Sequence, residues 1–201
     1  KNNNVLVIDT TNEEWWYVDH NGVKGYINSQ YLSPDYYFDW EKITYSTGSI
    51  PQCENFSPEY DFSLDNYLRI YVGKGIDVVV KLIKITDTMD ICNRVVYICE
   101  GDSYSIKNIP EGKYYLKIAY GKDFRQKIEN NKCIMKFTKN AVYEKGIDTL
   151  NYLVQRTKVI KDNKIHEMTK IPSYEIYLYI SSNFINENFN SIAITEEDFN
   201  K

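Results

Sequence analysis

Few residues of this chain have the types and the spacing that catalysis requires. The chain holds two histidines, His20 beside an Asn-Gly turn and His166 in a polar Lys/Asp/Asn segment. General acid–base and nucleophilic catalysis need a base positioned by a partner group, and no motif supplies one. A Gly-x-Ser-x-Gly elbow is absent from the sequence. The sequence therefore predicts a protein that is not an enzyme and that needs no cofactor.

Two other short patterns are compatible with chemistry but have simpler explanations. Gly73-Lys74-Gly75 has the composition of a phosphate loop, but such loops open a helix, whereas this one precedes the strand-like run Asp77–Val80. A tight hairpin is the better interpretation. The adjacent acidic pairs Glu13-Glu14 and Glu196-Glu197 are typical of solvated positions, because neighbours on a strand point to opposite faces.

Metal binding has no clear signature either. Asp87, Asp90 and Asp102 fall in expected loops but lack the ligand spacing of a dedicated calcium loop. The cysteines form no C-x-x-C pair and the two histidines lie far apart, so we expect no zinc site. Four cysteines allow three disulfide pairings, and buried free thiols are equally compatible with the pattern. These residues are Cys53, Cys92, Cys99 and Cys133.

Composition narrows the class of protein. The 201 residues carry a net charge of −4 with acidic and basic residues interspersed, so the basic stripe typical of nucleic-acid binders is missing. No run approaches the roughly 18 apolar residues needed to cross a bilayer. The opening residues Lys1–Asn4 lack the apolar core of a signal peptide, so we expect an export signal either to have preceded them or never to have existed.

Tyrosine is unusually frequent, with 19 residues, many of them alternating as in Tyr174–Tyr179. Tyrosine favours half-buried strands, which is the simplest interpretation. It is also enriched at recognition surfaces, because its rigid amphipathic ring buries a large area at low entropic cost.

The first 34 residues predict a small antiparallel sheet. Apolar runs at Val5–Ile8, Trp15–Val18 and Gly25–Ile27 are separated by turn residues. The Asn21-Gly22 pair between two of them is the strongest short hairpin signal that a sequence offers. Ser29–Leu32 is typical of a single helical turn.

The order Trp15-Trp16, Gly22, Gly25-Tyr26-Ile27 and Tyr31-Leu32 resembles the second half of a bacterial SH3-like domain. Members are small β-barrels that bind peptidoglycan or peptides in the bacterial envelope, through aromatic clusters. The resemblance implies an extracytoplasmic location, whether periplasm, cell surface or secreted, and a ligand-binding role for an aromatic set. Alternation places members of the set on both faces of the sheet, so some of them belong to the core. The set is Trp15, Trp16, Tyr17, Tyr26 and Tyr31.

Residues 35–66 form an aromatic connecting segment with scattered Gly48, Pro51 and Pro58. Because exposing so many rings is costly, we expect this segment to pack against a neighbouring domain. Beyond it, strand-like runs recur every eight to twelve or so residues, which predicts a β-sandwich over residues 67–201. A short helix is expected near Glu196–Asn200. The expected strands are Leu68–Val72, Asp77–Ile85, Arg94–Cys99, Ser103–Ile106, Lys113–Tyr120, Lys132–Phe137, Thr149–Arg156 and Ser173–Ile180.

The stretch Tyr104–Ile118 contains Asn108-Ile109-Pro110-Glu111-Gly112 followed by a Tyr-x-Leu strand. This resembles the hairpin of prealbumin-like modules, which include the carboxypeptidase regulatory domain, and the similarity spans roughly Leu68 to Tyr120. It implies a fold and names no ligand.

The sequence as a whole predicts an all-β protein, in which partial SH3-like barrel strands precede an antiparallel prealbumin-like sandwich. The predicted function is non-catalytic recognition of peptidoglycan or of a protein partner in the bacterial envelope. Two alternatives stay open, a structural subunit of a larger envelope assembly and an accessory region of a longer hydrolase. The missing first half of the SH3-like segment favours a longer parent protein.

Overall fold

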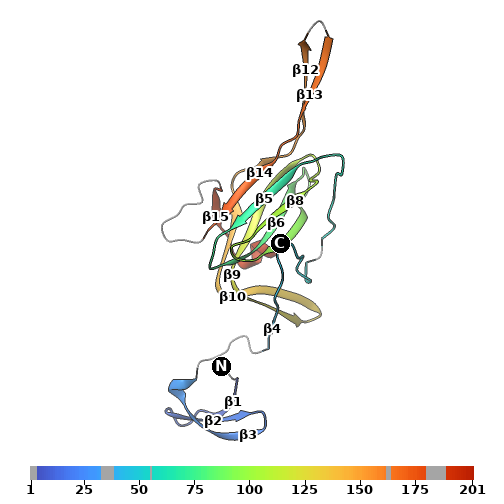
Figure 1. Ribbon diagram of the computed structural model, residues 1–201. Coiled ribbons are helices and arrows are strands. Elements are labelled where there is room, and N and C mark those ends of the chain that lie inside the picture. Colours follow the sequence, from blue (N-terminus) through green and yellow to red (C-terminus); the bar gives the residue numbers. More distant parts are fainter. Residues whose placement is uncertain (1–3, 33–38, 55, 162–163, 180–188) are drawn as a thin grey trace. The chain divides into compact units, whose positions relative to one another are not determined.

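The computed structural model describes the chain except for residues 1–3, 33–38, 55, 162–163 and 180–188 (Figure 1). The side chains of Lys161, Lys164 and His166 also lie outside what is described. The chain divides into two compact units, Lys1–Glu41 and Lys42–Lys201. Nearly all of the regular structure is β-strand, so the predicted all-β class is confirmed.

The elements follow one another along the chain with two short helical pieces among the strands. They are β1 (Leu6–Asp9), β2 (Trp15–His20), β3 (Val23–Asn28), the 3-10 helix η1 (Ser29–Tyr31), β4 (Glu41–Lys42), β5 (Tyr67–Val72), β6 (Asp77–Ile85), β7 (Ile91–Ile98), β8 (Ser103–Lys107), β9 (Lys113–Glu129), β10 (Lys132–Gly146), β11 (Leu150–Asn151), β12 (Gln155–Lys161), β13 (Lys164–Lys170), β14 (Tyr174–Leu178), β15 (Ser191–Ala193) and α1 (Glu196–Asn200).

The first unit is a three-stranded antiparallel sheet in the order β1-β2-β3. Asn21 and Gly22 connect β2 to β3 with φ angles of 53° and 85°. Two positive φ angles are what a type I′ hairpin turn requires, so the predicted Asn-Gly turn is confirmed. The Gly22 N–H also donates to Asp19 Oδ1 at 2.7 Å. The predicted helical turn is the 3-10 helix η1, where Asn28 accepts from the Gln30 N–H.

The second unit contains two sheets that form a sandwich. The larger sheet has the order β15-β10-β9-β6-β7, and β11 and β4 also pair with β9. The smaller sheet has the order β14-β5-β8, in which β14 runs parallel to β5. In this unit, the pairings of β15 with β10, β10 with β9, β9 with β6 and β11, β6 with β7, β5 with β8 and β12 with β13 are antiparallel. The strands β12 and β13 form a separate two-stranded hairpin that extends beyond the sandwich (Figure 1).

The core between the two sheets follows from two-residue alternation. Val78, Val80 and Leu82 on β6 face inward and meet Leu68 and Ile70 on β5, and all five are buried. Complete burial of such a side chain contributes about 1.5–3 kcal/mol relative to its exposure. The inward-facing rows therefore supply most of the force that holds the two sheets together.

The outer face of the larger sheet is also covered. Residues of the 42–66 segment and of α1 pack on it, and together they bury Val79, Tyr97, Phe124, Phe137 and Phe199 around the half-buried Tyr45 and Phe56. Of the aromatic residues behind the expected packing of the connecting segment, residues 36–38 lie outside the described residues and Trp40 belongs to the first unit, so that expectation stays a prediction. The packing on the outer face explains why β6 is buried on both faces instead of alternating.

Two contacts tie the 42–66 segment to the larger sheet. Glu54 Oε2 lies 2.9 Å from the largely buried Lys81 Nζ. Cys53 forms a disulfide with Cys133 on β10, across 80 residues of chain, which resolves the pairing that the sequence left open. Cys92 and Cys99 are free thiols. Burial raises the pKa of the Cys92 thiol to about 11, so at neutral pH it is protonated and unreactive.

The structure corrects several sequence-based expectations. Gly73-Lys74-Gly75 is not a tight hairpin, because β5 and β6 belong to different sheets and the three residues carry the chain from one sheet to the other. The expected strand Thr149–Arg156 is interrupted, because Tyr152 turns into the core and is fully buried. The strand β13 was not expected. Of the expected strand Ser173–Ile180, Ile180 lies outside the described residues.

Candidate aromatic binding site

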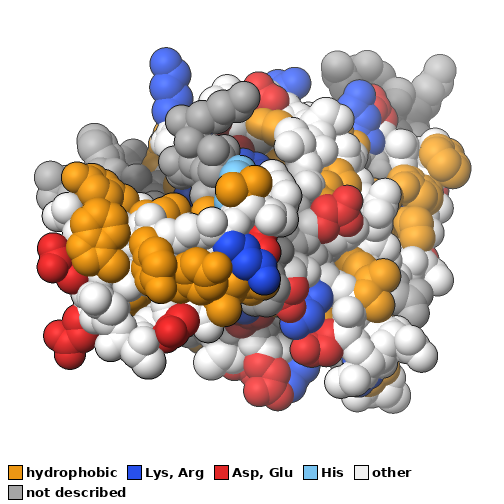
Figure 2. Space-filling view, turned by 90° about the horizontal axis from the view of Figure 1, so that it is seen from below, with side chains coloured by type: hydrophobic (Ala, Val, Ile, Leu, Met, Phe, Trp, Pro, Cys, Tyr) orange, Lys and Arg blue, Asp and Glu red, His pale blue; other side chains and the backbone are white. Residues whose placement is uncertain are grey.

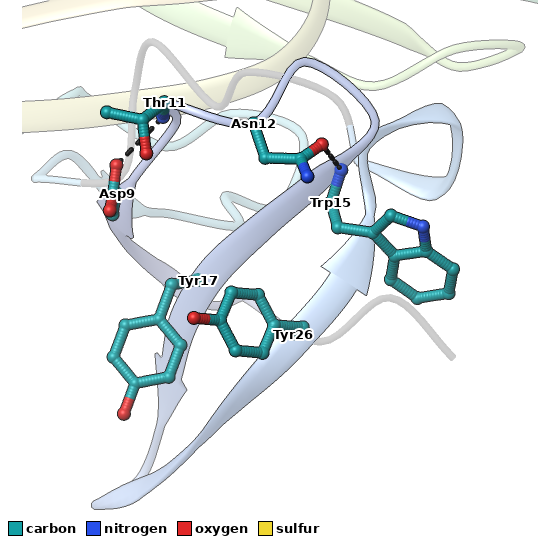
Figure 3. Close-up of a pocket in the computed structure, with 6 residues that line it drawn as sticks. All are labelled: Asp9, Thr11, Asn12, Trp15, Tyr17 and Tyr26. Atoms are coloured by element: carbon teal, nitrogen blue, oxygen red, sulfur yellow. Dashed lines mark hydrogen bonds between the residues drawn. The ribbon is translucent and has the colours of Figure 1, made fainter.

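A cavity of about 370 Å³ opens on the three-stranded sheet of the first unit (Figure 3). Three aromatic side chains form one part of its wall, and three polar side chains from the end of β1 and the β1–β2 loop form the other. The lining residues are Asp9, Thr11, Asn12, Trp15, Tyr17 and Tyr26. The volume lies at the lower end of the range for small-ligand sites, which suits one sugar ring or a short peptide segment.

Strand register brings the aromatic side chains together. Tyr17 on β2 lies directly opposite Tyr26 on β3, so both rings project from the same face, with centroids 4.9 Å apart. Trp15 precedes Tyr17 by two residues and therefore shares that face. Trp15 is 46% exposed and Tyr26 is 67% exposed. Large rings held at this exposure by a sheet are available for contact with a ligand.

The polar side of the cavity is shaped by local hydrogen bonds (Figure 3). A register irregularity between Val7 and Asp9 sets Asp9 opposite Tyr17. Asp9 Oδ1 accepts from the Thr11 N–H at 2.8 Å, and Asn12 Oδ1 accepts from the Trp15 N–H at 2.9 Å. The hydrogen bonds from the Thr11 backbone and hydroxyl lower the pKa of Asp9, so this carboxylate is ionised at neutral pH.

The sheet divides the five aromatic residues that the sequence singles out. Trp15, Tyr17 and Tyr26 line the cavity. Trp16 lies on the opposite face with Val18, which is buried, so Trp16 occupies the side that forms the unit's core. Tyr31 in η1 is 78% exposed and lies outside the cavity lining. The prediction of a ligand-binding role stays a prediction for each of them.

Sequence reasoning missed the polar half of the cavity. Asp9, Thr11 and Asn12 belong to a stretch that the sequence marks only as a turn. The available signal is that Asp and Asn side chains before a strand often accept hydrogen bonds from backbone N–H groups two or three residues on. Such bonds fix both the loop and the remaining side-chain oxygens, which is how a turn becomes part of a binding site.

The cavity lining combines side chains that can stack on a ligand with side chains that can hydrogen-bond to it. The lining offers one carboxylate, one amide, the hydroxyls of Thr11 and of the two tyrosines, and three aromatic rings. His20 lies at the far end of β2, where its Nδ1 is 2.9 Å from the Asn4 carbonyl oxygen. Among the described residues, no group of three or more His, Cys, Asp or Glu side chains is placed to hold a metal ion. Stacking and hydrogen bonding are what this cavity can provide.

A second aromatic surface lies on the second unit. Tyr71 on β5 stacks on Tyr177 of β14 with centroids 4.6 Å apart, and Tyr177 stacks on Tyr179 at 6.5 Å. Tyr71 and Tyr177 lie directly opposite each other on the two strands, which brings their rings side by side. Gly73 makes room for the last ring, since a Cβ there would lie 2.5 Å from the Tyr179 ring. These side chains cover the outer face of the smaller sheet.

Hydrophobic side chains are also conspicuous at the surface. The space-filling view shows a group of them side by side, among acidic and basic side chains (Figure 2). In the first unit the exposed apolar residues include Leu6, Val23 and Tyr26. Exposed apolar area of this kind often marks an interaction surface.

Comparison with known proteins gives no match. No protein-family model, no curated protein and no solved structure matches this chain. The SH3-like and prealbumin-like resemblances therefore rest on the residues quoted above. No helix among the described residues has the length and apolarity to cross a membrane.

Proposed function

We propose that this chain is a non-catalytic binding protein of the bacterial cell envelope, which recognises peptidoglycan through the first unit. The observation that supports the proposal is the cavity in which Trp15, Tyr17 and Tyr26 meet Asp9, Thr11 and Asn12.

The lining has the mixed character that a glycopeptide polymer requires. A sugar ring presents an apolar face and a rim of hydroxyl groups, so it stacks on an aromatic ring while its hydroxyls bond to short polar side chains. Asp9 can accept hydrogen bonds from sugar hydroxyls or peptide N–H groups, and it can pair with an amino group of the peptide stem. The resemblance to SH3-like domains points to the same class of ligand.

The disulfide supports an extracytoplasmic location. Disulfides persist in oxidising compartments and are rare in the bacterial cytoplasm. The Cys53–Cys133 bond joins two segments that are 80 residues apart, which gives it a structural role in the second unit. The disulfide thus supports the location in the proposal, and the cavity lining supports its ligand.

Pull-down on purified peptidoglycan tests this function with a matched pair of variants. Trp15→Ala removes a cavity ring, and we expect it to weaken retention by about tenfold or more, as for the truncation of an aromatic hot spot. Tyr31→Ala removes an even more exposed ring outside the cavity, and we expect it to leave retention unchanged. Circular dichroism checks that both variants keep the fold.

Two outcomes would contradict the proposal. The first is Trp15→Ala bound as well as the wild type with the fold intact. The second is equal loss of retention in Tyr31→Ala, since this would show that general exposed aromatic area, and not the cavity, holds the polymer.

A further inference from the structure

The hairpin of β12 and β13 is set apart from the rest of the second unit. Its two strands pair with each other and with no other described strand, in a register that runs from Gln155 opposite Lys170 to Lys161 opposite Lys164. At its base, Glu111 accepts hydrogen bonds from the Val154 N–H and from Arg156. Figure 1 shows the hairpin extending away from the sandwich. A two-stranded hairpin without a covering layer is only marginally stable in water.

The far part of the hairpin carries exposed apolar side chains on both faces. Ile160 lies directly opposite Ile165, and these side chains are 75% and 72% exposed. Met168 and Val159 lie on the other face of the same two strands and are also exposed. Side chains that project to opposite faces cannot all be covered by one flat protein surface, whereas a lipid interface surrounds an inserted hairpin on every side.

The hairpin is also basic within an acidic chain. The two strands hold five Lys or Arg residues and a single Glu, against a net charge of −4 for the whole chain. Lys158 is exposed on the face of Ile160, while Lys161 and Lys164 are the next residues toward the hairpin end. Basic residues beside exposed apolar ones are typical of segments that lie in the interface of an anionic membrane.

We propose that the end of the β12–β13 hairpin docks on the surface of an anionic lipid bilayer. Ile160, Ile165 and Val159 enter the boundary between head groups and acyl chains, and the exposed Lys158 pairs with lipid phosphates. Long lysine side chains can keep their charged ends at head-group level while their methylene stems remain in apolar surroundings. The hairpin thereby gains the covering that it lacks in water. This docking does not depend on the proposed peptidoglycan binding.

Vesicle sedimentation with the full chain tests the proposal. We expect the wild type to bind vesicles of phosphatidylcholine mixed with phosphatidylglycerol, to bind phosphatidylcholine alone poorly, and to be released by high salt. The double variant Ile160→Ser/Ile165→Ser removes apolar surface at exposed positions, and its partition coefficient should fall by about tenfold or more. Lys158→Gln should weaken binding by about fivefold, the share of one basic residue near an anionic surface.

The matched control is Ile128→Ser. Ile128 is 74% exposed near the turn between β9 and β10, the other long hairpin of this unit, and it should have no effect on vesicle binding. The proposal is overturned if the wild type does not bind the anionic vesicles, which would leave the hairpin end for a protein partner. It is equally overturned if the double serine variant binds as the wild type does, or if Ile128→Ser is the variant that loses binding. The vesicles contain no peptidoglycan, so failure here leaves the proposed function untouched.

Discussion

The two units differ most in how much apolar surface they bury. In the second unit, residues from both sheets form one core, and the outer face of the larger sheet forms another. In the described part of the first unit, Val18 is the one hydrophobic residue that is buried. A single covered position contributes little to stability, so the first unit depends on its hydrogen bonds and turns. This chain therefore places its stable core and its exposed cavity rings in different units.

The distribution of tryptophan along the chain allows the unfolding of the two units to be followed separately. All three tryptophans, Trp15, Trp16 and Trp40, belong to the first unit. Tryptophan emission therefore reports unfolding of the first unit, while far-UV circular dichroism is dominated by the strands of the second. Because the two units differ so much in burial, we expect these two signals to change at different denaturant concentrations.

Loss of the disulfide should have the largest effect on the difference between the tryptophan and circular-dichroism transitions. In the chain-entropy account, a bond that closes a loop of 80 residues stabilises by about 4 kcal/mol. The variant Cys53→Ser/Cys133→Ser should lower the free energy of unfolding of the second unit by about that amount, as measured by urea denaturation followed by circular dichroism. The tryptophan transition should not move.

Reduction provides the control for the disulfide. A thiol reductant should shift the circular-dichroism transition of the wild type and have no further effect on the double serine variant. If the tryptophan transition of the serine variant moved together with the circular-dichroism transition, the two units would not be energetically independent and the comparison would fail.

A cavity in the core should have a somewhat smaller effect. Leu82 is fully buried between the two sheets, and its replacement by alanine should lower the free energy of unfolding of the second unit by about 3 kcal/mol. Ile85 lies on the same strand but is exposed, so Ile85→Ala should change it by less than about 1 kcal/mol. Urea denaturation followed by circular dichroism measures both. Equal losses in the two variants would show that burial does not determine stability in this sheet.

The sequence predicts the fold where local signals agree with the final structure. Asn21-Gly22 gives the hairpin turn, and Glu196–Asn200 gives the terminal helix, because Thr195 caps it by accepting from the Asp198 N–H. The alternation on β5 gives the row of that strand that faces the core. In these places the residue types determine the structure by contacts within a few positions.

The remaining features depend on contacts that are distant in sequence. The long strands β9 and β10 continue past the expected ends, because their backbones stay paired as far as Glu129 opposite Lys132, even where like charges such as Lys122 and Lys139 face each other. The parallel pairing of β14 with β5 joins segments about 100 residues apart, and no local pattern specifies it. In the cavity of the first unit, alternation gives the shared face of Trp15 and Tyr17. The approach of Asp9 follows from a register irregularity that no sequence pattern marks.

The smallest expected effect is on how the stability of each unit falls in acid. A different carboxylate is responsible in each unit. Hydrogen bonds from the Val154 N–H and Arg156 lower the pKa of Glu111 in the second unit below 4.5, and hydrogen bonds from Thr11 lower that of Asp9 in the first unit below 3.8. A carboxyl group whose pKa is lower in the folded than in the unfolded chain stabilises the fold above its unfolded pKa. That contribution is lost as pH falls through the folded value.

Glu111→Gln should therefore flatten the decline of the circular-dichroism midpoint below about pH 4.5 and leave the tryptophan midpoint unchanged. Asp9→Asn should flatten the decline of the tryptophan midpoint below about pH 3.8 and leave the circular-dichroism midpoint unchanged. Urea midpoints recorded from neutral pH into this acid range measure both effects, which should be small because both carboxylates are exposed. A Glu111→Gln curve parallel to the wild type throughout would show that the base of the β12–β13 hairpin adds nothing to the stability of the sandwich.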